Sequence, residues 1–390
     1  MQNPALNPSI QLIQTETGYS AYDATTDKIH DLNPTASLIV ELCDGTRSVE
    51  EICALLAPML PPDSAEGLKQ WIDEGVAAGL LIPGGNPGNA HRELSADELR
   101  KISKRLRYKE KEQLAYLCAQ QATQLAPNDP ENWYELASVA EMVGTRDETR
   151  AAYEKYVELK PEDQEVRHIL IALRGEPAPP RMSNIALQQM YADFSTSFDE
   201  NLVKELDYKG PTQVRELIAP LLGDRKDLAV LDLGCGTGLA GVEFKPLAAR
   251  LVGVDISQEM IEMARARNLY DRLEVSEITD WLARCTERYE LVLACDCLIY
   301  FGDLRQVALP VAKLMCPPGP AQRKSIFAFT LEKSDVYPHR LLDSGRYAHH
   351  ADHVREVAAE AGLSVARLEE QFLRSEYGKP LTGLFVALEN

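Results

Sequence analysis

One short segment, residues 230–238, constrains the fold of this 390-residue chain more than any other. It reads Val-Leu-Asp-Leu-Gly-Cys-Gly-Thr-Gly, a strand-like run followed by a glycine cluster that opens a helix. Glycines let the backbone approach a ligand closely, and a helix N-terminus presents free amides. Asp255, 17 residues past Gly238, ends the next strand-like run, where a carboxylate can accept hydrogen bonds from both hydroxyls of a ribose. The segment therefore predicts an α/β fold with a parallel sheet and a nucleoside site at the strand ends.

The order of the acid and the glycines narrows the ligand. Asp232 stands two residues before a Gly-x-Gly-x-Gly run, whereas dinucleotide sites use Gly-x-Gly-x-x-Gly. An acid in that place suits a cationic ligand that carries an amino group. Residues 183–390 resemble the class I S-adenosylmethionine methyltransferases, in particular a group with tetratricopeptide repeats upstream. In this resemblance the sheet ends in an antiparallel hairpin, expected here at residues 365–376 and 381–388.

The resemblance implies S-adenosylmethionine as the cofactor and gives each matching position a role. The methionine moiety, the ribose, the adenine, the sulfonium and a covering lid each have their own residues. The residues implied for the methionine moiety are Asp232, Gly234, Cys235, Gly236 and Gly238, and the residue for the ribose is Asp255. Those implied for the adenine are Ile256, Glu277 and Ile278, and the one facing the sulfonium is Cys295. The implied lid residues are Tyr191, Phe194 and Phe198.

Four residues are candidates for the chemistry of transfer. Asp296, at the end of the expected fourth strand, is the first candidate base, with a helix cap or a cofactor contact as the alternative. Arg346, Tyr347 and His349 resemble a run that we interpret as lining the acceptor pocket in the repeat-bearing group. Arg346 could bind an acceptor carboxylate and His349 could take a proton near neutral pH. The alternative is that these are solvated loop residues with no role in the site. His349 and His353 stand one helical turn apart, but without further ligands the sequence predicts no metal.

The first 88 residues are expected to form a separate module of three short strands and three helices, winged-helix-like. Residues 28–36 and 42–52 resemble the PqqD-like family, whose domain captures the leader of a ribosomally made precursor peptide. In that family the leader adds as a strand to the third strand and lies against the third helix. The alternative is a small domain that only packs on its neighbours. The implied peptide-binding residues are Lys28, Ile29, His30, Leu32, Lys69, Trp71 and Ile72.

The middle of the chain contains an internal repeat. Pro127 and Pro161 lie 34 residues apart, each two residues after a leucine, and the spacing of aromatic and small residues between them fits the tetratricopeptide pattern. Such a block could be a peptide groove, a dimer surface or a rigid spacer, with residues 165–174 as a capping helix. The Pro- and Gly-rich stretches 83–89 and 175–180 predict linkers, which gives domains at 1–88, 92–178 and 183–390.

Composition limits the partners. The formal charge of −19 argues against binding to a phosphate backbone, and no apolar run approaches a membrane span. No secretory signal is evident, and eight scattered cysteines indicate reduced thiols, so we expect a cytoplasmic enzyme that could form a homodimer. The sequence predicts an S-adenosylmethionine-dependent methyltransferase of a ribosomal precursor peptide. The alternatives are methylation of a free metabolite or a folded protein, or a catalytically silent binding partner.

Overall fold

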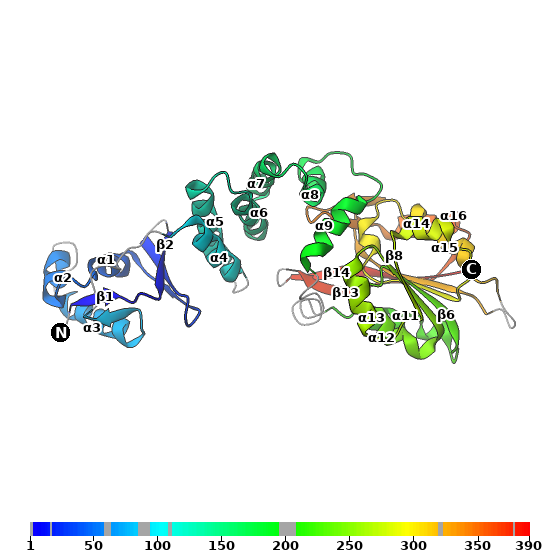
Figure 1. Ribbon diagram of the computed structural model, residues 1–390, viewed down its shortest axis with the longest axis horizontal. Coiled ribbons are helices and arrows are strands. Elements are labelled where there is room, and N and C mark those ends of the chain that lie inside the picture. Colours follow the sequence, from blue (N-terminus) through cyan, green and yellow to red (C-terminus); the bar gives the residue numbers. More distant parts are fainter. Residues whose placement is uncertain are drawn as a thin grey trace. The chain divides into compact units, whose positions relative to one another are not determined.

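The computed structural model describes residues 3–15, 18–57, 64–84, 94–107, 111–194, 208–318, 323–376 and 379–390. The chain forms two compact units, Met1–Leu159 and Lys160–Asn390, here called unit 1 and unit 2 (Figure 1). Among the described residues, no helix is both long and apolar enough to cross a membrane.

Unit 1 begins with a three-stranded antiparallel sheet in the order β2-β3-β4, and a separate ladder pairs β1 with β5. A capping box at Ser48 and Glu51 starts α2, as the sequence predicts. The winged-helix likeness stays a prediction. The elements are β1 (Pro4–Leu6), β2 (Ile10–Thr15), β3 (Gly18–Asp23), β4 (Lys28–Asp31), α1 (Pro34–Leu42), α2 (Val49–Leu56), α3 (Ser64–Ala77) and β5 (Leu81–Pro83).

The apolar faces of α1, α2 and α3 meet in one core. Ile39, Ile52 and Ile72 are its centre, and each is at most 2% exposed. The expectation that Ile72 contacts a bound peptide is therefore wrong, because its side chain faces inward from α3. Trp71 packs against the edge of the same core and stays partly accessible.

Four helices follow, α4 (Ala96–Leu106), α5 (Glu112–Leu125), α6 (Pro130–Val143) and α7 (Arg146–Leu159). The sheet shares a core with the first two of them. Ile13 of β2 and Tyr22 of β3 are buried together with Leu99, Ile102 and Leu106 of α4. The predicted linker at residues 83–89, of which 85–89 lie outside the described residues, thus joins two parts of one compact unit. The tetratricopeptide assignment of α4–α7 stays a prediction.

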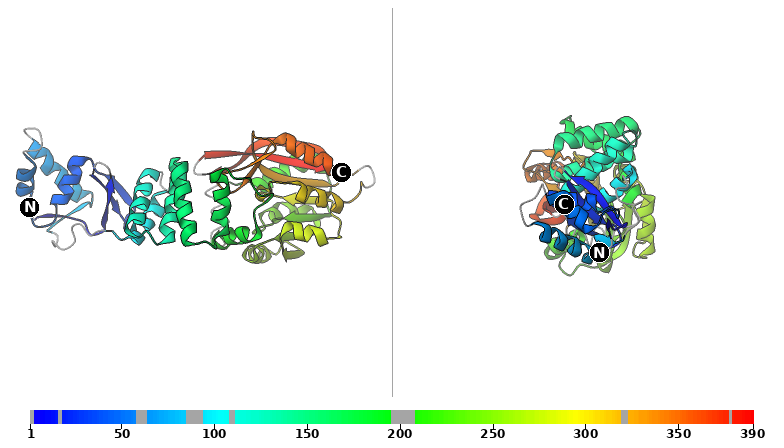
Figure 2. Two further views of the ribbon diagram at one scale, coloured as in Figure 1. Left: turned by 90° about the horizontal axis from the view of Figure 1, so that it is seen from above. Right: turned by 90° about the vertical axis from the view of Figure 1, so that its left-hand side faces the viewer.

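Unit 2 contains a nine-stranded, mostly parallel sheet. Strands β8, β7, β6, β9 and β10 pair in this order, all in parallel; β14 pairs antiparallel with β10 and β13, and the short β12 pairs with the end of β10 and with β11. The predicted hairpin is confirmed as β13 and β14, seen in red at one edge of the sheet in Figure 2. The strands are β6 (Leu228–Leu233), β7 (Ala248–Asp255), β8 (Arg272–Val275), β9 (Leu291–Ala294), β10 (Ile326–Lys333), β11 (His339–Leu341), β12 (Tyr347–His349), β13 (Ser364–Glu376) and β14 (Lys379–Glu389).

Helices cover both faces of this sheet (Figure 1). Successive residues of a strand point to opposite faces of its sheet, so both faces of β6 carry apolar side chains. Val230 packs with α11 and α12 on one face, and Leu231 packs with α14, α15 and α16 on the other. The helices are α11 (Gly210–Leu222), α12 (Leu239–Phe244), α13 (Gln258–Ala266), α14 (Ile278–Arg284), α15 (Arg305–Leu314) and α16 (Ala351–Glu360), with a short 3₁₀ turn, η5 (Leu298–Tyr300).

Helices α8 (Gln164–Arg174) and α9 (Asn184–Phe194) come before α11 and also belong to unit 2. A ring nitrogen of His168 in α8 lies 3.1 Å from the carbonyl oxygen of Gly345, and Ile169 would touch a Cβ added at that glycine. The helix expected to cap the repeat therefore packs on the sheet unit instead, because its apolar side faces the loop before β12.

Candidate cofactor and acceptor site

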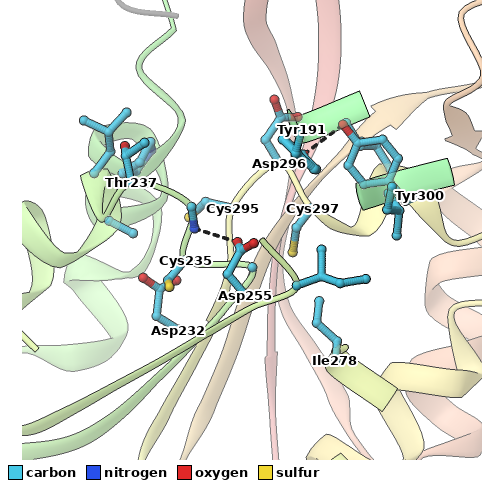
Figure 3. Close-up of a pocket in the computed structure, with 18 of the residues that line it drawn as sticks. Tyr191, Asp232, Cys235, Thr237, Asp255, Ile278, Cys295, Asp296, Cys297 and Tyr300 are labelled. Carbon is cyan, nitrogen blue, oxygen red and sulfur yellow. Dashed lines mark hydrogen bonds between the residues drawn. The ribbon is translucent and has the colours of Figure 1, made fainter. Parts of the chain in front are cut away.

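A cavity of about 220 Å³ lies at the carboxyl ends of the central parallel strands of unit 2 (Figure 3). Segments that follow β6, β7, β8 and β9 all contribute to its wall, which is where open α/β sheets bind ligands. The cavity brings together most of the residues implied by the sequence. Those that line it are Tyr191, Asp232, Gly234, Cys235, Gly236, Asp255, Ile256, Glu277, Ile278, Cys295, Asp296 and Arg346. Gly238, which begins α12, is not among the lining residues.

Among the groups in this wall, Asp232 says most about the charge of the ligand. It is 1% exposed, and its Oδ2 accepts a hydrogen bond of 2.6 Å from the Tyr270 hydroxyl. Its Oδ1 is buried and has no hydrogen-bond partner among the described residues. Burial raises the pKa of Asp232 to about 7. A buried carboxylate oxygen left unused is costly, and it fits a ligand that brings an ammonium group.

The glycine loop is shaped by close contacts. Gly234 has a φ of 65°, and a Cβ added there would lie 2.5 Å from the Cβ of Cys297, so a side chain would clash with the opposite wall. The amide of Cys235 donates to the Val254 carbonyl, and that of Gly236 donates to Asp255. These two amides therefore hold the loop on β7, whereas the sequence analysis expected the loop backbone to hold the ligand.

Asp255 ends β7 and is almost fully buried. Its Oδ2 accepts from the Gly236 amide at 2.8 Å and its Oδ1 from the Ser257 amide at 2.9 Å. Burial raises its pKa, while these backbone hydrogen bonds act in the opposite direction. Each carboxylate oxygen has a second lone pair, so the group can still accept from hydroxyls. Ile256 next to it packs under α9 and offers an apolar surface for a flat ring.

Glu277 and Ile278 stand at the start of α14. The Glu277 carboxylate caps this helix by accepting from the Asp280 amide at 2.9 Å. Ile278 is 8% exposed and faces both the cavity and the core beneath it (Figure 3). This hydrogen bond holds the Glu277 carboxylate in one position on the cavity wall.

Helix α9 forms part of the cavity wall, and its role as a lid stays a prediction. Its Leu187, Met190 and Tyr191 line the cavity, and the hydroxyl of Tyr191 lies 3.0 Å from that of Tyr300 (Figure 3). Phe198, also assigned to the lid, lies outside the described residues, and the same is true of the side chain of Phe194.

Asp296 belongs to a buried network of charges. Its carboxylate accepts two hydrogen bonds, of 2.8 and 2.9 Å, from Nη1 of Arg374. Arg374, 4% exposed, also binds Glu332, and Nε of Arg346 donates to the same Glu332 carboxylate at 2.6 Å. Two guanidinium groups thus balance two carboxylates beside the cavity. Protonating Asp296 would disrupt a paired, desolvated contact, so this arrangement favours a charged positioning group over a proton acceptor.

The structure moves two predicted residues out of the site. Tyr347 and His349 lie on β12, are fully buried and do not line the cavity. The Tyr347 hydroxyl donates to the Pro179 carbonyl, and a ring nitrogen of His349 lies 2.8 Å from the Phe301 carbonyl oxygen. Burial lowers the pKa of His349 to about 3. The expectation that they line the acceptor pocket is wrong, because residues read as a loop form a strand paired to β10.

Several wall or support residues were not predicted from the sequence, among them Arg374 and three tyrosines. Arg374 carried no signal, because it is one of several charged residues in β13 and its partner Asp296 is 78 positions away. Nothing in the sequence marks the tyrosines either. They are Tyr208 and Tyr300, which line the cavity, and Tyr270, which binds Asp232.

Comparison with known families and proteins agrees with this geometry. The family model described as "Methyltransferase domain" matches residues 230–319, and that described as "Coenzyme PQQ synthesis protein D (PqqD)" matches residues 18–81. The ubiquinone biosynthesis O-methyltransferase of Xanthomonas oryzae pv. oryzae is 27% identical over 184 residues, which are 42% of this chain and 74% of that protein.

Two solved methyltransferases are similar to this chain in fold. The magnesium protoporphyrin IX methyltransferase of Synechocystis PCC 6803, with bound S-adenosylmethionine, is 16% identical and covers 55% of this chain and 100% of its own, with a TM-score of 0.39. The 1,6-didemethyltoxoflavin-N1-methyltransferase of Burkholderia thailandensis is 20% identical and covers 55% of this chain and 92% of its own, with a TM-score of 0.41.

The glycine loop, the unused Asp232 oxygen and the matched domain define the class of protein. It is an enzyme, an S-adenosylmethionine-dependent methyltransferase, and its cofactor is S-adenosylmethionine. The same chain carries a PqqD domain in unit 1. When bound, the cofactor supplies a methyl group on a positively charged sulfur; Asp232 and Asp255 are the residues that would hold its amino group and ribose.

Proposed function

We propose that this chain methylates a ribosomally made precursor peptide, whose leader binds to unit 1 and whose core reaches the cavity of unit 2. The PqqD match over residues 18–81 is the observation that carries the proposal. In this reading unit 1 holds the leader, which raises the effective concentration of the core at the acceptor end of the cavity.

Strand β4 supports the proposed leader site. Among the described strands it pairs only with β3, so it is an edge of the sheet with backbone groups on its other side. Lys28 is exposed and His30 half-buried, while Ile29 packs toward the core shared with α4 and α5. Added strands are bound by such main-chain edges, and pockets for alternate side chains give the specificity.

Helix α3 contributes less than the sequence implied. Its Lys69 and Trp71 are half-buried and remain candidates for a peptide contact, as does Leu32 after β4. Ile72 does not, because it is buried in the core.

At the catalytic end, the chemistry needs alignment of the acceptor and exclusion of water more than it needs a strong base. Helix α9 closes one wall with Tyr191, which is hydrogen-bonded to Tyr300. Asp296 and Arg346 are charged groups on the acceptor side, and both are held by the network around Arg374. We assign them to positioning the acceptor group of the core peptide.

The experiment compares a full precursor peptide with the same core lacking its leader, using mass spectrometry to locate the added methyl group. Tethering of this kind is worth roughly 10²- to 10⁴-fold, so we expect kcat/KM to fall at least about 100-fold without the leader. Equal rates on the two substrates would refute the tethering.

Variants of β4 test where the leader binds. Proline is placed in turn at Ile29 and at His30, because neighbouring amides in an edge strand point alternately toward and away from the sheet. The variant that retains the wild-type melting temperature should lose leader binding, measured by fluorescence anisotropy, with methylation of the leaderless core unchanged. Proline at Gln11, in the opposite edge strand β2, is the matched control.

A free metabolite as acceptor is the second candidate. It is favoured by the 27% identical relative, which is named for ubiquinone biosynthesis. In that case small phenols would be methylated at rates that added leader peptide does not change, so the same assay separates the two proposals.

A further inference from the structure

Three histidines of unit 2 meet away from the cofactor cavity. His339 is on β11, His349 on β12 and His353 in the first turn of α16. Their ring centroids are 5.7, 5.9 and 6.3 Å apart, and one possible ligand nitrogen from each lies within 4.8 Å of the other two. In the sequence, only His349 and His353 stand at a spacing typical of metal ligands. His339 could not be recognised with them, because it comes from the separate strand β11.

The nitrogens of this cluster are unusually short of partners. The Nδ1 atoms of all three rings are buried without a hydrogen-bond partner among the described residues, and so is Nε2 of His353. His349 is fully buried, with Nε2 lying 2.8 Å from the Phe301 carbonyl oxygen. A carbonyl only accepts, so Nε2 carries the proton and the lone pair on Nδ1 remains unused. Buried polar atoms left unsatisfied are rare and call for an explanation.

We propose that His339, His349 and His353 bind a divalent transition-metal ion, Zn²⁺ in the first place. Three neutral imidazoles suit zinc and its neighbours, whereas Mg²⁺ and Ca²⁺ require oxygen ligands. A backbone carbonyl that holds the other nitrogen of a ligand histidine is the usual outer partner at such sites, and Phe301 supplies it for His349.

The fit requires only local adjustment. Zn–N bonds of about 2.0–2.1 Å in a tetrahedral site place two nitrogens about 3.4 Å apart, so small rotations of the rings close the present gaps. Gly302 leaves room for this, since a Cβ there would lie 2.9 Å from Nε2 of His339. The cation Arg305 nearby is already paired with Glu360 and Asp303, which limits its repulsion of the ion.

The ion would add a cross-link between β11 and the segment formed by β12 and the first turn of α16, which follow each other directly in the chain. It would tie the short β11–β12 pair to α16, and His349 would extend that tie through its contact with Phe301, a residue that lines the cofactor cavity. The site is thus a structural clamp behind the acceptor wall, separate from the chemistry of methyl transfer.

The test uses the full chain without a polyhistidine tag, first stripped with a chelator and then titrated with Zn²⁺ by calorimetry and with Co²⁺ by visible absorption. We expect one ion per chain and the intense d–d bands of a tetrahedral cobalt site. His339→Ala and His353→Ala should each weaken Zn²⁺ binding by more than the roughly 10- to 100-fold that outer partners contribute.

Two matched controls make the result decisive. His30→Ala, in unit 1, and His350→Ala, next to the cluster but outside it, should bind Zn²⁺ as the wild type does. Circular dichroism confirms that each variant is folded, and His349 is left intact because it is fully buried. No zinc binding by the stripped wild type, or binding that depends on His350 but not on His339, would overturn the proposal.

Discussion

Protonation of Asp232 and binding of the cofactor should be linked, which gives a direct test of the site. Burial raises the pKa of this carboxyl from an ordinary 3.8 to about 7, and only the ionised form can pair with the ammonium group of S-adenosylmethionine. The apparent dissociation constant then contains the factor 1 + 10^(pKa − pH). That factor is about 30 at pH 5.5 and about 2 at pH 7, so binding should tighten about 15-fold between them.

The assay is calorimetric titration with S-adenosylmethionine at pH 5.5, 6.25 and 7, in two buffers of different ionisation enthalpy. The range stays below pH 7.7–8.0, where a free α-amino group loses its own proton. Proton release should fall from nearly one proton at pH 5.5 to about half a proton at pH 7, because a group with a pKa of about 7 is then half protonated. Tyr270→Phe removes the hydroxyl that lowers the pKa of Asp232, so the whole profile should move to higher pH.

The same pKa has a consequence of opposite sign for stability. A carboxyl whose folded pKa lies above its unfolded value stabilises the fold while protonated, and the benefit is lost as pH rises from about 3.8 to about 7. The pKa is raised by about three units, and each unit corresponds to 1.36 kcal/mol. Ionised Asp232 therefore lowers the free energy of unfolding above pH 7 by about 4 kcal/mol. Asp232→Asn should therefore raise the unfolding free energy of the cofactor-free chain above pH 7 by up to this amount, while cofactor binding is lost.

Two outcomes would refute this reasoning. One is a dissociation constant that does not change from pH 5.5 to 7 in the wild type. The other is an Asp232→Asn variant that binds the cofactor as tightly as the wild type and unfolds at the same denaturant concentration. Asp335→Asn, at a side chain that is 93% exposed, is the matched control and should change neither quantity.

Two further substitutions test the walls of the cavity. Gly234→Ala places a methyl group against Cys297 on a backbone with a left-handed conformation. It should destabilise unit 2 by about 2–4 kcal/mol and abolish cofactor binding. Thermal melting with and without S-adenosylhomocysteine measures both effects. Arg374→Met leaves the partly buried Asp296 without its cation and the buried Glu332 with Arg346 alone, and should cost about 3–5 kcal/mol in urea unfolding. A Gly234→Ala chain that melts and binds normally, or a neutral Arg374→Met, would contradict the respective contact.

The cofactor half of the site was predictable because its residues are close together in the sequence. A glycine loop and the acids after successive parallel strands meet at one sheet edge whatever the rest of the chain does. Asp232, Gly234 and Asp255 therefore lie where the motif places them.

The acceptor half was not predictable, because its members come together only through strand pairing. Asp296 meets Arg374 through the sheet, 78 positions away, and Glu332 joins them from β10. His349 failed as a candidate for the same reason, since pairing of β12 with β10 buries a residue that reads as part of a polar loop.

The boundaries of the units depend on packing in the same way. Pro- and Gly-rich stretches mark where helices and strands stop, but they do not show which apolar faces will meet afterwards. Residues 83–89 look like a linker, yet Ile13 of β2 and Leu99 of α4 share one core across it. Helix α8 reads as the end of a repeat and instead belongs to unit 2.

The amino-acid sequence by itself determined the class of chemistry and the cofactor, because a glycine loop and its acids act through local backbone geometry. Tertiary structure alone decided which charges balance at the acceptor wall, which of the candidate side chains reach the cavity, and that three histidines from two strands and a helix converge. Such contacts depend on burial and register across distant segments, and neither quantity is written in any one stretch of the chain.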